Sequence, residues 1–305
     1  MEWRKLGRLI EPASAPWMVT HAAVPFVHRL SDDDVRIYFT SRDAEGRSHT
    51  GFAELDVRDP FGSLRISDAP VLSPGEMGAF DDRGAMGSWV VEKDGLLHMY
   101  YIGWNLGVTV PFYSWTGLAV SSDGGLTFER ETRGYAFPRD DVDPFIATNP
   151  SLIVEDDLWR IWYISGVRWV VEDGEPKHYY HIKYDESPDG RNWERLGTVA
   201  IDFACEEEYA IARPAVFRRP DGYEMLYAYR AQPSTATYRI GFATSDDGRV
   251  WTRRDDEAGI DVSNDGFDSE MVCYGTTFDH GADRYLLYNG NGYGQTGIGL
   301  AVLDA

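Results

Sequence analysis

The sequence predicts an all-β fold, and two repeated patterns are the basis of this prediction. The first is an aromatic strand core that recurs five times along the 305 residues. The successive cores, centred on Tyr38, Tyr100, Trp162, Tyr227 and Tyr288, lie 62, 62, 65 and 61 residues apart. A repeat of this length, with several short strands in each copy, is typical of a closed array of sheets.

The second pattern is a strand, an Asp-Gly turn and another strand, and it follows three of the aromatic cores. It occupies residues 116–130, 182–197 and 240–254. Asp-Gly readily adopts the positive backbone dihedrals of a tight turn, so these segments predict antiparallel hairpins. The first and last copies carry the corresponding strand, at residues 50–56 and 296–305, without the turn.

The two ends of the chain complement each other. The final copy stops after its third strand, whereas residues 2–7 (EWRKLG) match residues 192–197 (NWERLG), which we expect to form the fourth strand of the third copy. Pairing the ends would remove open sheet edges. We therefore predict a five-bladed β-propeller in which the N-terminal strand closes the last blade, with residues 1–305 as a single domain.

Composition excludes several partners. A net charge of −21 argues against binding to nucleic acid or anionic lipid. No apolar run approaches the roughly 20 residues of a membrane span. The first residues lack a signal-peptide core, which predicts a cytoplasmic location.

Metal and disulfide chemistry is also disfavoured. The cysteines are Cys205 and Cys273, too few for a disulfide framework or a zinc spacing. No contiguous calcium-binding loop of the EF-hand kind is present. We predict no metal and no cofactor.

Function is expected where the innermost strands of the blades converge on the propeller axis. These strands are predicted at residues 20–27, 84–91, 147–154, 211–217 and 270–278. The positions leading into them are unusually polar. Carboxylates that face each other across a pocket are what glycosidic bond cleavage requires, one as proton donor and one to activate water or attack carbon.

These entrances supply the candidate site residues. We predict catalytic roles for Glu208, Asp82, His21 and Glu270, and substrate binding by Arg213, Arg83, Asn149, Tyr274 and Asp268. Glu208 ends a run of three glutamates that would ordinarily be a solvated surface. Here the run leads straight into an inner strand. Arg213 would be an unpaired charge in the core, so it needs a carboxylate partner or an anionic ligand.

Other interpretations of these residues stay open. His21 also fits a hydrogen-bonded structural histidine, and Asp82 and Arg83 also fit an ordinary turn. Two long connections, residues 104–115 and 167–181, are rich in aromatic side chains: Trp104, Phe112, Tyr113, Trp115, Trp169, Tyr179 and Tyr180. Flat rings suit the apolar faces of sugars, but they also suit a protein interface or the rim of a blade.

The five repeats, the S-x-D-G-x-x-W hairpins and strands such as DGYEMLYAYR (221–230) resemble the five-bladed propellers of the glycoside hydrolase superfamily that contains families 43, 32, 68, 117 and 130. The resemblance covers essentially the whole chain, and it implies an axial sugar site. The catalytic triad of family 43 does not carry over. Its Asp-Pro corresponds to Val24-Pro25, its second Asp to Ser88 or Trp89, and its Glu-Gly-Pro to Ala212-Arg213-Pro214.

The sequence thus predicts an atypical glycoside-hydrolase-like enzyme that acts on a sugar or glycoconjugate in an axial pocket. Two alternatives remain. One is a non-catalytic carbohydrate-binding propeller. The other is a sugar lyase or transferase that acts on an anionic or activated sugar, since Arg83 and Arg213 favour an anionic substrate. The expected partner is a small-molecule carbohydrate or glycoconjugate, and the oligomeric state is left open.

Overall fold

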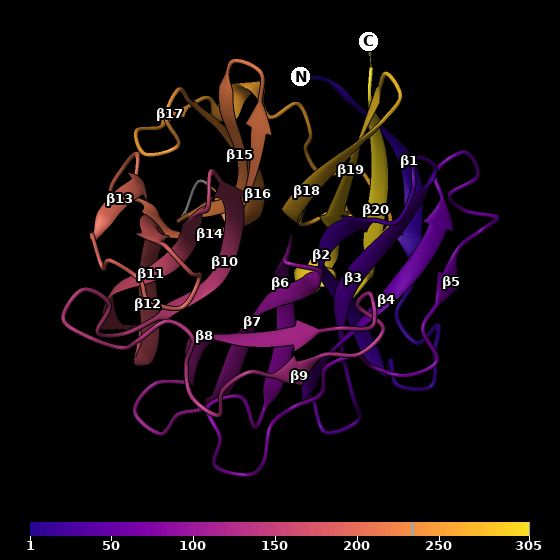
Figure 1. Cartoon of the computed structure of the whole chain (residues 1–305). Helices are drawn as coiled ribbons and strands as arrows, with labels where there is room; N and C mark the ends of the chain where they lie inside the picture. The colour runs from indigo at the N-terminus through magenta and orange to yellow at the C-terminus, as the bar shows by residue number, and fades with distance from the viewer. Residues whose placement is uncertain (233–234, 305) are drawn as a thin grey trace.

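The structure is a computed structural model that describes residues 1–232 and 235–304, and nearly all of its regular structure is strand (Figure 1). The strands in chain order are β1 (Trp3–Ile10), β2 (Thr20–Arg29), β3 (Asp34–Arg42), β4 (Ser48–Asp56), β5 (Arg65–Ile66), β6 (Gly84–Lys93), β7 (Leu96–Leu106), β8 (Phe112–Ser121), β9 (Glu129–Arg130), β10 (Ala147–Glu155), β11 (Leu158–Glu172), β12 (Glu175–Ser187), β13 (Thr198–Ile201), β14 (Glu208–Arg219), β15 (Gly222–Ala231), β16 (Thr235–Ser245), β17 (Thr252–Arg253), β18 (Cys273–His280), β19 (Asp283–Asn289) and β20 (Ile298–Leu303). The helical segments are a 3-10 turn, η1 (Asp255–Glu257), and α1 (Asn291–Gly294). The all-β prediction is confirmed.

The strands pair as antiparallel units that follow one another along the chain. The first four units are β2–β5, β6–β9, β10–β13 and β14–β17, and single parallel bridges between neighbouring units join them into a 16-stranded sheet. The remaining strands form a separate four-stranded sheet in the order β1-β20-β19-β18. Figure 1 shows these units arranged around a common centre, with β2, β6, β10, β14 and β18 nearest to it.

The N-terminal strand lies beside the last strand of the chain. β1 pairs antiparallel with β20, with Trp3 opposite Leu303 and Ile10 opposite Ile298. Residue 305, the end of the predicted final segment, lies outside the described residues.

The predicted fourth strand at residues 192–197 is wrong, because the fourth strand of that unit is β13, which pairs with Ile182–Tyr184. Asp185 accounts for the difference. Its carboxylate accepts hydrogen bonds from the backbone N–H groups of Arg195 (2.9 Å) and Leu196 (3.2 Å), so these groups are not free for a ladder.

The Asp-Gly turns join one unit to the preceding one. A hydrogen bond within each turn stabilises it, because the hydroxyl of a serine at the start of the turn accepts a hydrogen bond from the backbone N–H of the glycine. In one turn Ser187 accepts this bond from Gly190 (2.9 Å). The turn then accepts a hydrogen bond from the aromatic core of the previous unit. Tyr38 donates to Gly125 O (2.9 Å), Tyr100 to Gly190 O (2.6 Å) and Trp162 to Gly248 O (2.8 Å). Each such buried bond contributes about 1 kcal/mol to stability.

A second repeated contact holds the middle of four units together. A tyrosine on the second strand donates to a buried or half-buried aspartate, which also pairs with a basic side chain. The four sets are Tyr101–Asp81–Arg130, Tyr163–Asp143–Arg195, Tyr227–Asp255–Arg253 and Tyr288–Asp268–Lys5. Many of the acidic residues near the inner strands therefore have structural partners.

Hydrophobic clusters fill the spaces between units. For example, Tyr38 and Phe26 of the first unit pack in one cluster with Leu97 and Tyr100 of the second. Burial of each large aromatic or aliphatic side chain stabilises the fold by about 1.5–3 kcal/mol. Among the described residues, the structure has no helix with the length and apolar character of a membrane span.

Candidate functional site in a central cavity

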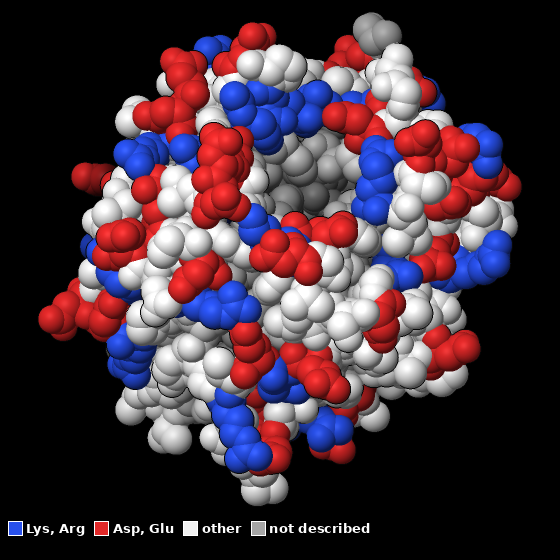
Figure 2. Space-filling model, viewed as in Figure 1, with Lys and Arg blue, Asp and Glu red and all other residues white. Residues whose placement is uncertain are grey.

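The molecule is hollowed near the centre of the face shown in Figure 2, where both basic and acidic side chains border the opening. A cavity of about 400 Å³ is lined by residues from all five units. Most of its walls are aromatic or aliphatic, with the aromatic side chains Trp104, Phe112, Tyr180, Tyr238, Tyr274 and Tyr293. Its polar lining consists of Thr40, Ser114, Thr148, Asn149, His21, His178, Arg42 and Arg230.

Irregularities in the inner strands aim side chains at this cavity. The ladder register shifts around Val24, Asn149, Arg213 and Tyr274, and each of these residues has a positive φ, between 53° and 57°. An extra residue in a β-bulge re-aims a side chain, and positive φ at a non-glycine residue costs about 1–3 kcal/mol. The strain therefore falls on equivalent positions of four inner strands. Three of them, Val24, Asn149 and Tyr274, line the cavity.

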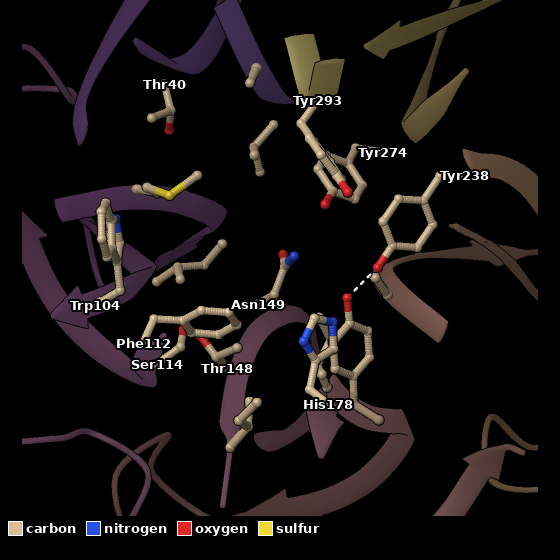
Figure 3. A pocket seen from close by; sticks show the side chains of 18 of the residues that line it. Thr40, Trp104, Phe112, Ser114, Thr148, Asn149, His178, Tyr238, Tyr274 and Tyr293 are labelled. Carbon is tan, nitrogen blue, oxygen red and sulfur yellow. Dashed lines mark hydrogen bonds between the residues drawn. The ribbon is translucent and has the colours of Figure 1, made fainter. Parts of the chain in front are cut away.

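A serine and an asparagine are fixed together at the centre. Ser88 Oγ donates to Asn149 Oδ1 (2.9 Å) and lies 2.7 Å from Pro150 O. Because Ser88 satisfies the amide oxygen, the Asn149 NH₂ group is left to donate to a ligand. Figure 3 shows Asn149 between the Trp104 and Phe112 side of the cavity and the Tyr274 and Tyr293 side.

The two histidines of the cavity are neutral at physiological pH. Burial lowers the pKa of His21 to about 4, with a further contribution from Arg42. Burial likewise lowers the pKa of His178 to about 4, with Arg230 contributing. His178 also stacks on Tyr180, with ring centroids 4.6 Å apart. Both imidazoles can therefore serve as neutral hydrogen-bonding groups.

Three buried tyrosines of the cavity, Tyr180, Tyr238 and Tyr274, are protonated. The hydroxyls of Tyr180 and Tyr238 are hydrogen-bonded to each other (Figure 3). Burial raises the pKa of Tyr180 to about 12, and it raises the pKa of Tyr238 and of Tyr274 well above the ordinary value. These hydroxyls are donors and acceptors toward a polar ligand.

Carboxylates are missing from the wall of this cavity. Within the part of the chain that the structure describes, no aspartate or glutamate lines it. The same part of the chain contains no group of three or more His, Cys, Asp and Glu side chains that could hold a metal ion. The pair of carboxylates that glycosidic bond cleavage ordinarily uses is therefore not present in the lining.

Three of the nine site residues predicted from sequence line the cavity: His21, Asn149 and Tyr274. Glu208 does not. It is 6% exposed and forms a two-pronged ion pair with Arg253, at 2.7 Å from each oxygen. Its carboxylate also accepts the Ala204 N–H (2.7 Å). The glutamate run thus leads into an ion pair between Glu208, at the start of β14, and Arg253 of β17.

The other acidic candidates also lie outside the lining. Asp82 caps a turn by accepting the Gly78 N–H (2.9 Å). Asp268 belongs to the Tyr288 and Lys5 set described above, and Glu270 is exposed. The sequence-based placement of these three carboxylates at the pocket is therefore corrected. Asp82 is held within its own turn and Asp268 by strands of its own unit, whereas the backbone of Glu270 accepts hydrogen bonds from Thr237 and Arg239 of β16 in the preceding unit.

The two predicted arginines lie outside the lining as well. Arg83 donates to Glu45 O (2.8 Å). Arg213 is 0% exposed and has neither the expected carboxylate partner nor a place in the cavity wall. It donates to Pro25 O (2.8 Å) and Pro214 O (3.2 Å), and its guanidinium lies 5.7 Å from the Trp89 ring centroid. Burial lowers the pKa of Arg213 to about 9.

Sequence analysis missed Arg42, Arg230, His178, Tyr238 and Tyr293 in the lining, whereas the aromatic connections did contain Trp104, Phe112 and Tyr180. Arg42 and Trp104 each lie four residues after the aromatic core of their unit, and Arg230 lies three residues after Tyr227. The signal for Arg42 and Arg230 was therefore the end of the second strand of a unit, next to the entrance of the inner strand. His178, Tyr238 and Tyr293 lie on β12, β16 and α1 instead.

Comparison with solved structures places the fold among glycoside hydrolases. A structure described as a glycoside hydrolase matches 99% of this chain and 91% of its own, with a TM-score of 0.79 and 19% identity. A thermostable family-43 glycoside hydrolase matches with a TM-score of 0.70 and 15% identity over 96% of this chain and 92% of its own. A β-1,2-mannobiose phosphorylase from Listeria innocua matches with a TM-score of 0.69 and 12% identity over 98% and 94%. The predicted resemblance to glycoside hydrolases of propeller-type families is confirmed for the fold.

No protein-family model matches the chain. Two curated proteins, uncharacterized protein MT1551 and uncharacterized protein Rv1502, come from strains CDC 1551 and H37Rv of Mycobacterium tuberculosis. Each is 40% identical to this chain over 305 residues, which is 100% of both sequences. The chain therefore belongs to the family of these two mycobacterial proteins and has the fold of propeller-type glycoside hydrolases.

Proposed function

We propose that this protein is carbohydrate-active and binds a sugar or glycoconjugate in its central cavity. The observation that carries the proposal is the cavity itself. Its volume of about 400 Å³ is within the usual range for small-molecule sites, and aromatic walls surround a few convergent polar groups. Trp104 and Phe112 offer flat faces for a sugar ring, while Asn149, Thr148 and Ser114 offer partners for hydroxyl groups.

The proposal includes the finer architecture. The five consecutive units and the pairing of β1 with β20 support a closed five-bladed propeller, and the continuity of the repeats supports a single domain over residues 1–305. The structural neighbours support sugar chemistry, since they include glycoside hydrolases and a β-1,2-mannobiose phosphorylase. The cytoplasmic location stays a prediction from the first residues of the sequence.

Sugar recognition is favoured over ordinary hydrolysis, because the described lining has no carboxylate pair. An atypical glycoside hydrolase or another sugar-converting enzyme is the second candidate. It is favoured by the strained backbone at Val24, Asn149 and Tyr274 and by the paired hydroxyls of Tyr180 and Tyr238. In that case His21 and the tyrosines are the groups available for proton transfer. Glu208, Asp82 and Glu270 are not part of this proposed site.

The test is saturation-transfer NMR against a panel of mono- and disaccharides, followed by Trp104→Ala. Loss of the stacking face should weaken binding by about tenfold, at a small change in melting temperature. Phe61→Ala is the matched control, because Phe61 is an aromatic side chain exposed in the loop after β4. Binding that survives Trp104→Ala unchanged would refute a sugar site in this cavity.

Turnover on nitrophenyl glycosides and nucleotide sugars separates the two candidates. Binding without turnover supports recognition. Turnover that is lost on substitution of Tyr238 by Phe, while binding is retained, supports the enzyme.

A further inference from the structure

We propose that the sugar bound in the central cavity carries an anionic group, a phosphate or a carboxylate, and that Arg42 and Arg230 hold this group. The inference rests on the proposed function, because it names the class of carbohydrate that the cavity accepts. It is carried by the position and the missing partners of these two arginines.

Most buried or half-buried arginines of this protein are neutralised by a carboxylate, as Arg36 is by Glu54 and Arg253 by Glu208. Arg42 and Arg230 differ. Among the described residues, no carboxylate lies within 4 Å of either guanidinium. A desolvated cation without a counter-charge is costly unless a ligand supplies one.

The side chain of Arg42 is especially free. It lines the cavity at the end of β3 and donates no hydrogen bond to any described residue. Burial lowers the pKa of Arg42, and the contribution that opposes this comes from Tyr274. Its five N–H donors are therefore available to a planar or tetrahedral anion.

Arg230 is positioned by aromatic rings, with one hydrogen bond. Its Nη1 donates to the Tyr293 hydroxyl (2.9 Å), and its guanidinium lies 4.7 Å from the Tyr209 ring centroid and 4.9 Å from that of Tyr238. Its Nε is buried without a hydrogen-bond partner. The packing of the rings fixes the orientation of the Arg230 guanidinium, but it supplies no negative charge to pair with it.

The charged side chains of the described lining are both basic. Arg230 lies beside Tyr238 and Tyr293, and Arg42 reaches the same cavity from the end of β3. No aspartate or glutamate of the described residues lines it. Although the protein carries a net charge of −21, the wall of this cavity is therefore locally positive.

The side of the cavity formed by Trp104 and Phe112 suits the sugar ring. Figure 3 shows Trp104, Phe112, Ser114 and Thr148 together, across the cavity from Tyr238, Tyr274 and Tyr293. A ligand with an apolar ring face at one end and an anion at the other matches both sides. A neutral sugar would leave Arg42 and Arg230 buried by the ligand without a counter-charge.

The experiment is isothermal titration calorimetry on the full chain with matched ligands. Each sugar is tested as the neutral form, the uronic acid and the phosphate monoester, and inorganic phosphate is tested alone. We expect an anionic form to bind at least about tenfold more tightly than its neutral parent, since each charge-assisted hydrogen bond is worth about that factor. The advantage should shrink at high ionic strength. The better of the two anionic forms identifies the group as phosphate or carboxylate.

Arg42→Gln tests the residue directly. We expect it to remove the advantage of the anionic form and to lower the affinity for the neutral sugar far less, whereas Arg42→Lys retains part of the advantage. Arg65→Gln is the matched control, because Arg65 is exposed on β5 and is not part of the cavity lining. Because Arg42 holds no other group in place, the variant should fold, and its melting temperature verifies this.

The outcomes separate the two proposals. Equal binding of neutral and anionic forms would overturn the anion site and leave the sugar site standing. Inorganic phosphate that binds as tightly as the sugar phosphate, with both lost in Arg42→Gln, would overturn the assignment of the anion to the sugar. Absence of binding in every arm would overturn both proposals.

Discussion

Replacing Asp143 by Asn tests whether the acidic residues near the inner strands are structural. Asp143 is 0% exposed and accepts hydrogen bonds from Tyr163 (2.9 Å) and Arg195 (2.6 Å), with Ser165 also donating to it. Lys183 lies 3.3 Å from the same carboxylate. The substitution keeps the shape of the side chain and removes its charge. Two half-buried cations then lose a counter-ion.

The expected loss follows from these contacts. Breaking a buried ion pair by removing one partner costs about 3–5 kcal/mol. Arg195 keeps an ion pair with Asp140 (2.7 Å), so we expect the lower end, about 3 kcal/mol. For a chain of 305 residues, that corresponds to a melting temperature about 5 °C lower.

The measurement is thermal unfolding followed by circular dichroism, with Asp141→Asn as the control. Asp141 is exposed, two residues away, and has the same charge. We expect the control to unfold within about 1 °C of the parent. If Asp143→Asn is as stable as Asp141→Asn, the structural role of the repeated tyrosine, aspartate and cation sets is refuted.

Two further predictions concern pH and the glutamate at the start of β14. Burial, with Arg230, lowers the pKa of His178 to about 4 from 6.5, so on acidification through this window the unfolded chain takes up a proton before the folded chain does. Stability is therefore lost as the pH falls from 6.5 toward 4, by up to about 3 kcal/mol for this residue. His178→Gln should reduce this loss of stability in melting curves recorded between pH 6.5 and pH 4. Part of the loss should remain, because the pKa of His21 is lowered in the same direction. A loss of stability as large as that of the parent protein would contradict the prediction. Glu208→Gln should lower stability by about 1.5–3 kcal/mol through its contacts with Arg253 and leave sugar affinity unchanged in calorimetry. Loss of affinity at an unchanged melting temperature would instead show that Glu208 acts on the ligand.

The fold was predictable because its determinants are local and repeated. The aromatic cores and the S-x-D-G turns are both visible in the sequence, and the structure shows that they bind each other across neighbouring units, as Tyr100 and Gly190 do. The match between the N-terminal strand and residues 192–197 also has a physical basis. It aligns Lys5 with Arg195, and both are the cation of a tyrosine and aspartate set.

The register of the repeat was predicted less well. Tyr227 and Tyr288 donate to aspartates, and so do Tyr101 and Tyr163. In the second and third units, the residues equivalent to Tyr227 and Tyr288 are therefore Tyr101 and Tyr163. Each lies one position after the residue that was chosen from the sequence as the core of its unit, Tyr100 or Trp162. A one-residue slip moves every side chain to the other face of a strand, so the entrance residues could not be assigned to the pocket reliably.

The site was predictable only in part. Asn149 and Tyr274 line the cavity because bulges with positive φ turn them toward it, and an X-Pro or X-Gly pair in an inner strand is a visible signal for such a bulge. Glu208 was misplaced because a run of glutamates does not reveal which basic residue is its partner. Arg253 lies 45 positions later in the chain. Arg42 was overlooked because its importance comes from the absence of a partner, which is a property of three-dimensional surroundings.

The central claim is that sugar binds in the central cavity, between Trp104 and Arg230. A crystal structure of the protein with a sugar that binds in calorimetry tests it most directly. We expect electron density for the ring beside Trp104 and Phe112, with its charged substituent at Arg42 and Arg230. Density at Glu208, or on the outer strands of a unit, with an empty central cavity would contradict the account.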